Sequence, residues 1–187
     1  MALNIKIDFN DCYPVRTLNE NFSLSFFNST LQTGEKIPIG INISDEPHPL
    51  IPNVYNLAFG PLKANNQIDD KVKLYHQDHS KLFSTIVFTG LSFLRSNREK
   101  FLGIDGSNNA RTYMYYRCIQ NNYEYLKQFM NIYGVNYYIR ILRKIKEEDD
   151  CFPFDEEDIK ALPQTIVRHL PIKHEKLHNY FIFNLIQ

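Results

Sequence analysis

The residues best suited to chemistry lie around Gly106, where a short apolar stretch ends and a helical pattern begins. A helix N-terminus presents free backbone N–H groups and a partial positive charge, and glycine lets the backbone approach a ligand closely. Ser107 and Asn108 add polar side chains, and Arg111 can form a bidentate contact with a phosphate or a carboxylate. Tyr115 follows Arg111 by four residues, on the same helical face. These five residues predict an anion-binding site.

A purely structural role explains the same residues. Ser107 or Asn108 would cap the helix by accepting a backbone N–H, and Arg111 would pair with a carboxylate. The available carboxylates are Asp69, Asp70 and Asp105. The stretch is neither a P-loop nor a dinucleotide-binding fingerprint. The sequence therefore leaves both interpretations open.

Tyrosines and histidines form two further groups. Eight of the 12 tyrosines fall between Tyr113 and Tyr138, where they could stack nucleic-acid bases beside arginines or pack helices onto a sheet. His76 and His79 flank Asp78 and could supply metal ligands, but no further ligand has a suitable spacing. A polar helix-capping loop explains them better, so no metal is predicted.

The sequence contains no G-x-S-x-G nucleophile motif, and no catalytic residue or cofactor is predicted. A strand, helix and strand with Asn108, Ala110 and Tyr115 is similar to the end of the acetyltransferase fold. Those enzymes are expected to carry a glycine-rich turn before an earlier helix, and residues 78–80 contain no glycine. The similarity therefore gives little support for that activity.

The elements that would position these residues follow from hydrophobic periodicity. Alternating apolar residues predict strands at 3–9, 22–26, 37–43, 54–60 and 101–104, with a hairpin turn at 33–35 and a partner strand at 71–75. Three prolines predict a loop over 44–53. Helical spacing begins at Ser80, capped by Asp78 or Ser80, and a second helix runs from Asn108 to Ile119. Gly90 within the first helix indicates close packing against a neighbour.

The later part of the chain predicts a helical segment to Tyr133 that ends at Gly134, and then a strand over 135–145. The fold class is therefore α+β, a largely antiparallel β-sheet with two or three helices packed on one face. Residues 1–146 are predicted to form one domain, and residues 147–187 an acidic connector and extension that docks on the core or a partner. Within this extension, 159–170 is expected to be a short helix interrupted by Pro163, and 180–186 an edge strand or docking segment.

Composition limits the function classes. The chain has 187 residues, 21 basic and 21 acidic side chains and no net charge, so no global basic excess supports nucleic-acid binding. A hydrophobic content of 43% excludes a wholly disordered chain. Apolar runs are much shorter than the roughly 20 residues that cross a bilayer, so no membrane contact is predicted. Widely spaced Cys12, Cys118 and Cys151 indicate reduced thiols and a cytoplasmic location.

From about residue 22 to residue 142 the chain resembles an uncharacterised family of small bacterial α+β proteins. The resemblance rests on Tyr55 to Gly60, on Ile68 to Asp70, and on Gly106 to Thr112 with Tyr115. The last of these segments is similar to the family pattern G-S-T-x-A-R-T-R-L-Y-R. This chain departs from the family at Pro61, Asn108, Tyr113 and Tyr116. The family has no established activity, so the resemblance implies no catalytic role.

Two functions are consistent with these observations. The first is a cytosolic binding or interaction protein with a protein partner or a homo-oligomeric state, for example in a bacterial toxin–antitoxin or defence module. The acidic connector and the apolar C-terminus favour it. The alternative is a nucleotide- or nucleic-acid-processing enzyme whose phosphate site is the Gly106–Ser107 junction.

Overall fold

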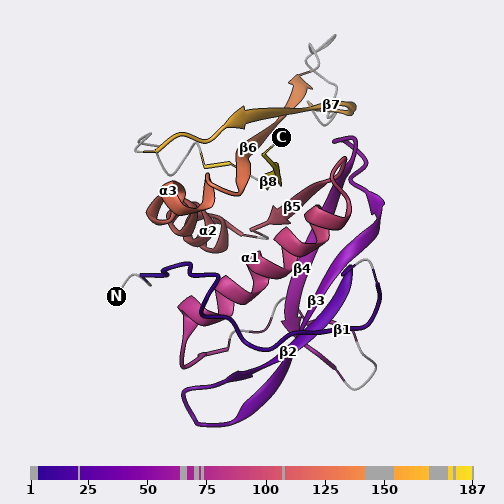
Figure 1. Ribbon diagram of the computed structural model, residues 1–187. Helices are drawn as coiled ribbons and strands as arrows, with labels where there is room; N and C mark the ends of the chain where they lie inside the picture. The colour runs from indigo at the N-terminus through magenta and orange to yellow at the C-terminus, as the bar shows by residue number, and fades with distance from the viewer. Residues whose placement is uncertain are drawn as a thin grey trace, which may run out of the picture.

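The computed structural model describes residues 4–20, 22–63, 67–69, 72, 74–106, 108–141, 154–168, 177–178 and 180–186. Strands dominate this part of the chain (Figure 1). They are β1 (Arg16–Thr17), β2 (Leu24–Thr30), β3 (Lys36–Pro47), β4 (Val54–Pro61), β5 (Phe101–Asp105), β6 (Met130–Ile141), β7 (Phe154–Thr165) and β8 (Tyr180–Leu185). The helices are α1 (His79–Ser96), α2 (Asn109–Asn121) and α3 (Tyr123–Leu126).

The strands form one sheet in the order β1-β2-β3-β4-β5-β8-β6-β7. All neighbouring pairs are antiparallel except β4 and β5, which are parallel and are joined through α1. Buried side chains of α1, α2 and α3 share one apolar core with the sheet. The predicted α+β class, a largely antiparallel sheet with packed helices, is confirmed.

Helix α1 lies close to the middle of the sheet (Figure 1). Asp78 caps it, because its Oδ1 accepts the backbone N–H of Lys81 at 2.8 Å. A Cβ added to Gly90 would lie 3.0 Å from Leu102 Cδ1 and 3.2 Å from Leu57 Cδ1. Gly90 therefore allows the close packing of helix on sheet that its position in the sequence indicates.

The predicted first strand is extended but unpaired. Ile5 and Ile7 are buried, as the alternation indicates, but residues 4–8 are not part of a strand. Their backbone N–H groups are bound by side chains of the helical layer instead. Lys6 N–H donates to Ser80 Oγ at 3.0 Å, Ile7 N–H to Asn122 Oδ1 at 2.7 Å and Asp8 N–H to Ser84 Oγ at 2.9 Å.

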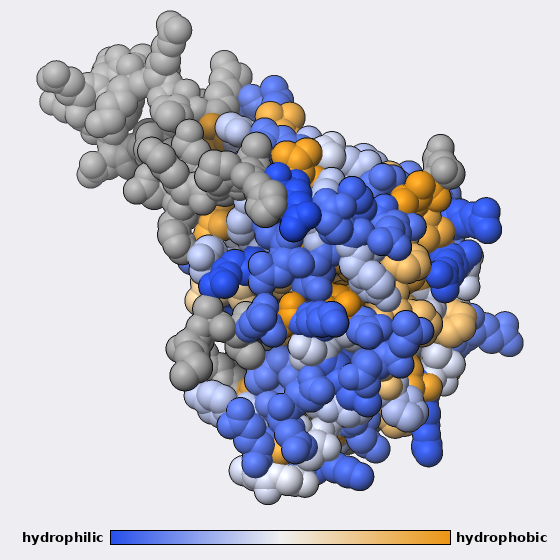
Figure 2. All heavy atoms as spheres, turned by 60° about the vertical axis from the view of Figure 1, so that its left-hand side comes forward, coloured by the Kyte–Doolittle hydropathy of each residue, from blue (hydrophilic) through white to orange (hydrophobic). Residues whose placement is uncertain are grey.

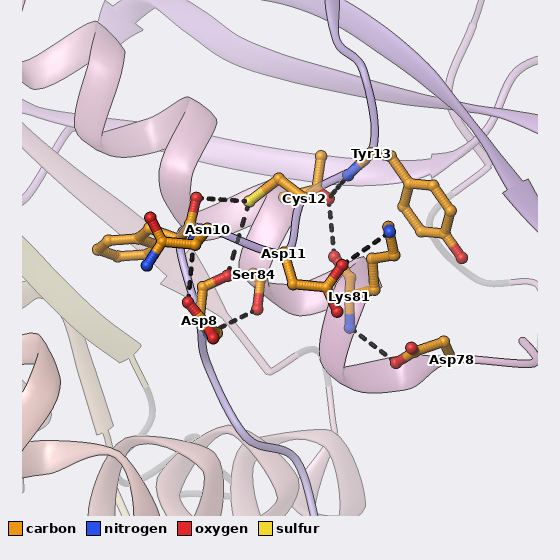
Figure 3. A network of polar contacts seen from close by, with 10 residues as sticks. Asp8, Asn10, Asp11, Cys12, Tyr13, Asp78, Lys81 and Ser84 are labelled. Atoms are coloured by element: carbon orange, nitrogen blue, oxygen red, sulfur yellow. Dashed lines mark hydrogen bonds and ion pairs between the residues drawn. The ribbon is translucent and has the colours of Figure 1, made fainter.

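The same segment continues along the first turns of α1 (Figure 3). Lys81 Nζ forms an ion pair with Asp11 at 2.7 Å, and Tyr13 N–H donates to Thr85 Oγ1 at 2.8 Å. The Cys12 thiol donates to the backbone oxygen of Phe9, with an Sγ–O distance of 3.6 Å. These contacts fix the N-terminal segment against α1 without a strand partner.

Burial predicts low reactivity for both described thiols. Burial raises the pKa of the half-buried Cys12 thiol, and it raises the pKa of the buried Cys118 thiol to about 12. At pH 8 we expect iodoacetamide to modify Cys118 at least about a hundredfold more slowly in the folded chain than in urea, with Cys12 between these limits. Mass spectrometry of the separated peptides measures the rate at each cysteine. It also distinguishes Cys151, which lies outside the described residues. Equal folded and unfolded rates at Cys118 would contradict its burial.

Two predictions for the first half need correction. β3 continues to Pro47 through a register shift after Ile43, so the loop before β4 is shorter than the predicted 44–53. Ser44 Oγ bridges this irregularity, since it donates to Glu46 O and accepts the N–H of Asn56. The predicted return strand at 71–75 does not form in its described residues 72, 74 and 75. Isolated bridges lie on either side of it instead, from Leu62 to Ile68 and from Leu31 to His76. Residues 64–66, 70, 71 and 73 lie outside the described residues.

Three predictions for the second half are also wrong. The helical segment after Asn122 ends at Leu126 rather than at Tyr133, and Gly134 lies inside β6. A Cβ at Gly134 would lie 2.1 Å from His178 Cδ2, so this glycine makes room for a ring instead of capping a helix. The predicted helix over 159–170 is mainly strand β7. Pro163 is tolerated there because β7 is at the edge of the sheet.

The C-terminal segment is an interior strand rather than an edge strand. β8 pairs with β5 on one side and β6 on the other. Phe181 joins the core beneath the helices, while Tyr180 and Ile182 pack in a second cluster with Val54 and Val135. Burial on both faces explains why this segment is so apolar. Residues 142–153, which include most of the acidic connector, lie outside the described residues.

No helix in the described ranges is both long and apolar enough to cross a bilayer. The face shown in Figure 2 is mostly hydrophilic, with hydrophobic residues in small separate groups. The coloured residues of that face therefore form no extended apolar surface.

Candidate functional site

The sheet opens between β4 and β5. These strands pair over only three residues each, from Val54 opposite Phe101 to Asn56 opposite Gly103. Beyond that point β4 continues beside β3 as far as Pro61, and β5 continues beside β8 as far as Asp105. The carboxyl ends of two parallel strands therefore separate, which is a common place for a ligand site in sheets of this kind.

A cavity of about 510 Å³ lies at this opening and is here called the first cavity. Much of its lining is apolar and comes from β3, β4, β5 and α1. These residues include Ile39, Leu57, Phe59, Leu82, Phe83 and Ile104. Helix α2 adds Asn108, Arg111 and Tyr115, so the fold brings three of the five predicted site residues to one cavity.

The three α2 residues have different surroundings. Asn108 is the N-cap, and its Oδ1 accepts the N–H of Arg111 at 3.0 Å. The Arg111 side chain is half-buried one turn into the helix. Tyr115 is buried, with its ring centroid 6.4 Å from that of Phe59 and 6.2 Å from that of Phe83. Tyr115 therefore belongs to the aromatic wall, and Arg111 is the charged group of α2 in this cavity.

Gly106 has a packing role that the sequence did not reveal. A Cβ at this position would lie 2.0 Å from Thr112 Oγ1 and 2.6 Å from Thr112 N. The first turn of α2 thus fills the space where a ligand was expected to approach the glycine. Gly106 does not line the first cavity, and Ser107 lies outside the described residues.

The charges of the first cavity are mixed. Arg111 faces the same space as Asp69 and Asp105, and Asp69 forms an ion pair with Lys63 at 3.1 Å. Asp70, the third predicted carboxylate, lies outside the described residues. The described lining of the first cavity therefore combines one guanidinium with two carboxylates.

His76 and His79 also line the first cavity. Burial lowers the pKa of both imidazoles, which favours neutral rings near pH 7. His76 Nδ1 lies 2.8 Å from Ser29 Oγ, so a hydroxyl already occupies one ring nitrogen. In the part of the chain that the structure describes, no three His, Cys, Asp or Glu side chains are grouped as metal ligands.

The tyrosine group mostly serves packing. Tyr115 and Tyr116 are buried, and the hydroxyl of Tyr125 accepts the N–H of Phe9 at 3.0 Å. Tyr113 has the guanidinium of Arg117 at 5.8 Å from its ring centroid. Tyr138 is the exposed exception, at 51%. A row of exposed rings for stacking bases is not formed by these residues.

A second cavity, of about 840 Å³, shares Asn56, Asp105 and Asn108 with the first. It is also lined by His48, Tyr137, His178 and Tyr180, which sequence reasoning did not connect. These residues come from the segment before β4, from β6, and from β8 and the residues before it. No local motif joins them, and only the insertion of β8 between β5 and β6 brings them together.

The model of one protein family matches residues 10–154. The chain belongs to DUF6934, a family of unknown function. This finding confirms the resemblance to an uncharacterised family, whereas the exact signature around Gly106 stays a prediction. No curated protein and no solved structure matches the chain.

The DUF6934 match covers β4, β5, α2 and β6, and so includes the strand opening and Arg111. It ends at residue 154, before β8 and the Tyr180 side chain of the second cavity. The family description names no activity, so the functional argument rests on the geometry of the two cavities.

Proposed function

We propose that this chain binds a small organic ligand in the first cavity, with Arg111 holding a single anionic group. The observation that carries the proposal is a volume of about 510 Å³ with apolar walls and a guanidinium at its side. Ligand pockets are typically about 300–1,000 Å³, mostly apolar, with a few polar groups that fix orientation. An aryl or aliphatic body would lie against Phe59 and Phe83 while its anionic group reaches Arg111.

The charges favour one anionic group over several. Asp69 and Asp105 line the same cavity and would repel a di- or triphosphate. A guanidinium can contact a protein carboxylate and a ligand anion at once, because it has five N–H donors. A carboxylate or a phosphate monoester is therefore the preferred class, which narrows the nucleotide alternative to monophosphates.

Acyl-CoA chemistry has little support from the start of α1. Asp78 caps that helix and accepts the Lys81 N–H at 2.8 Å. A pyrophosphate at the same N-terminus would meet a carboxylate, and residues 74–78 contain no glycine to let its oxygens approach the backbone. The acetyltransferase similarity of α2 is therefore not extended to a function.

The interaction hypothesis loses one of its reasons. The apolar residues of β8 are explained by the sheet interior, and the acidic connector mostly lies outside the described residues. A protein partner or homo-oligomer stays a prediction, as does a toxin–antitoxin or defence setting.

Arg111→Ala is expected to weaken binding of the preferred ligands by about tenfold or more, because a charge-assisted bidentate contact is worth about 1.5–3 kcal/mol. The affinity of Arg111→Lys should lie between those of the wild type and Arg111→Ala, because lysine keeps the charge but lacks the planar guanidinium. Calorimetric titration with 3-phenylpropionate and phenyl phosphate measures these changes in affinity. Titration with ATP tests whether a triphosphate is repelled.

Arg117→Ala is the matched control. Arg117 lies on the same helix but packs over Tyr113 and does not line the first cavity. It should leave affinity unchanged within about twofold. Loss of affinity in both variants alike, or no binding of either single-anion probe to the wild type, would contradict the proposal.

A further inference from the structure

A carboxylate and several aromatic rings line the second cavity together. Asp105 ends β5 with an exposed side chain and is the charged residue among those that the structure describes in this lining. His48 stacks beside Tyr137, with 6.1 Å between ring centroids, and is tilted against Tyr180 at 5.3 Å. All four side chains face the same space.

Hydrogen bonds determine which ring nitrogen of His48 carries the proton. The N–H of Leu50 donates to His48 Nδ1 at 3.1 Å, so a neutral ring carries its proton on Nε2. Nε2 lies 3.3 Å from the Tyr137 hydroxyl, which therefore accepts from it. Burial lowers the pKa of His48, in agreement with a neutral ring that brings no positive charge to the cavity.

Two further side chains of the lining provide acceptor oxygens. The Tyr180 hydroxyl donates to Asn56 Oδ1 at 3.1 Å, which leaves lone pairs on both oxygens. Burial, and then the nearby negative charge of Asp105, raises the pKa of the Tyr137 hydroxyl, so this group stays protonated near pH 7. Among its lining groups the cavity thus has one carboxylate, neutral hydroxyl and amide oxygens, and aromatic rings.

We infer that the second cavity binds an ammonium group, with Asp105 as its counter-ion and the rings of His48, Tyr137 and Tyr180 around it. An ammonium ion has three donors and no acceptor, which matches this set of oxygens. Aromatic faces attract cations, and a carboxylate beside them strengthens the site.

The inference does not depend on a ligand of Arg111, because the rings of His48, Tyr137 and Tyr180 line the second cavity and Arg111 does not. The two cavities nevertheless meet at Asn56, Asp105 and Asn108. A single ligand with an anionic group at one end and an ammonium group at the other would therefore contact both.

Titration with phenethylamine and with its neutral counterpart 2-phenylethanol, followed in ¹H–¹⁵N spectra of the full chain, tests the inference. The amine should bind at least about tenfold more tightly than the alcohol and shift the amides of Leu50 and Asn56. Asp105→Asn should abolish this preference. Glu99→Gln, which removes an exposed carboxylate elsewhere, should keep it.

Equal binding of amine and alcohol, or an Asp105→Asn variant that keeps the preference, would overturn the inference. If Asp105→Asn does not fold, the wild-type comparison of amine with alcohol still decides. The comparison of amine with alcohol uses no anionic probe, and the titration with phenyl phosphate uses no amine, so the two proposals can fail independently.

Discussion

Replacing Asn122 with alanine is expected to lower the free energy of unfolding by about 3 kcal/mol, because it leaves buried backbone groups without partners. Asn122 is only 6% exposed. Its Oδ1 accepts the N–H of Ile7 at 2.7 Å, and its Nδ2 donates to the backbone oxygens of Ile5 at 2.9 Å and Cys118 at 2.7 Å. One side chain thus replaces the strand partner that the N-terminal segment lacks.

Asn121→Ala provides the matched control, since Asn121 is exposed and adjacent. It should change the unfolding free energy by less than about 0.5 kcal/mol. Asn122→Asp should be at least as damaging as alanine at neutral pH, because a carboxylate would face two carbonyl oxygens. Urea unfolding followed by circular dichroism measures all three. Similar stabilities for Asn122→Ala and Asn121→Ala would show that Asn122 does not hold the segment.

The second large effect is expected at Gly106. An alanine Cβ would lie 2.0 Å from Thr112 Oγ1, 2.6 Å from Thr112 N and 2.7 Å from Thr112 Cα. Two of these atoms are backbone and cannot rotate away, so Gly106→Ala should cost about 3 kcal/mol. Adding Thr112→Ala should not restore stability, because the backbone contacts remain. Thermal or urea unfolding measures both variants.

Gly34→Ala separates conformational strain from crowding. Gly34 has φ +86°, and a Cβ there would have no heavy atom within 4 Å. Its substitution should cost only about 1 kcal/mol. A Gly106→Ala protein with wild-type stability that no longer binds ligand would reverse our assignment and make Gly106 a ligand contact.

Periodicity identified buried faces more reliably than it identified their partners. The alternation at Ile5 and Ile7 correctly predicted burial, but the neighbours are helix side chains rather than a strand. The pattern of β8 indicated burial as well, but its interior position depends on strands far away in sequence. Local patterns record how a segment meets the core and contain no information on which element lies beside it.

Turn and breaker residues predict the wrong element where tertiary contacts outweigh local preference. Gly134 was interpreted as a helix end, but it accommodates the ring of His178 inside β6. Pro163 was interpreted as a helix interruption, but it lies in an edge strand where its missing N–H costs no ladder bond. Gly134 has no positive φ, so it is required there for space rather than for a turn.

The candidate site was predictable to the extent that it is local. Asn108 as N-cap and Arg111 with Tyr115 on one face follow from helical spacing alone, and all three line the first cavity. The second cavity needs His48 and Tyr180, which lie 132 positions apart in the sequence. Only the topology of the sheet joins them.

Anion binding by Arg111 is tested most directly by its side-chain Nε–H resonance during titration of the ¹⁵N-labelled chain with phenyl phosphate. We expect a saturable shift of that resonance and of the amides of residues that line the first cavity, while the Arg117 resonance stays in place. An unchanged Arg111 resonance at saturating ligand, or shifts confined to residues outside the cavity, would contradict it.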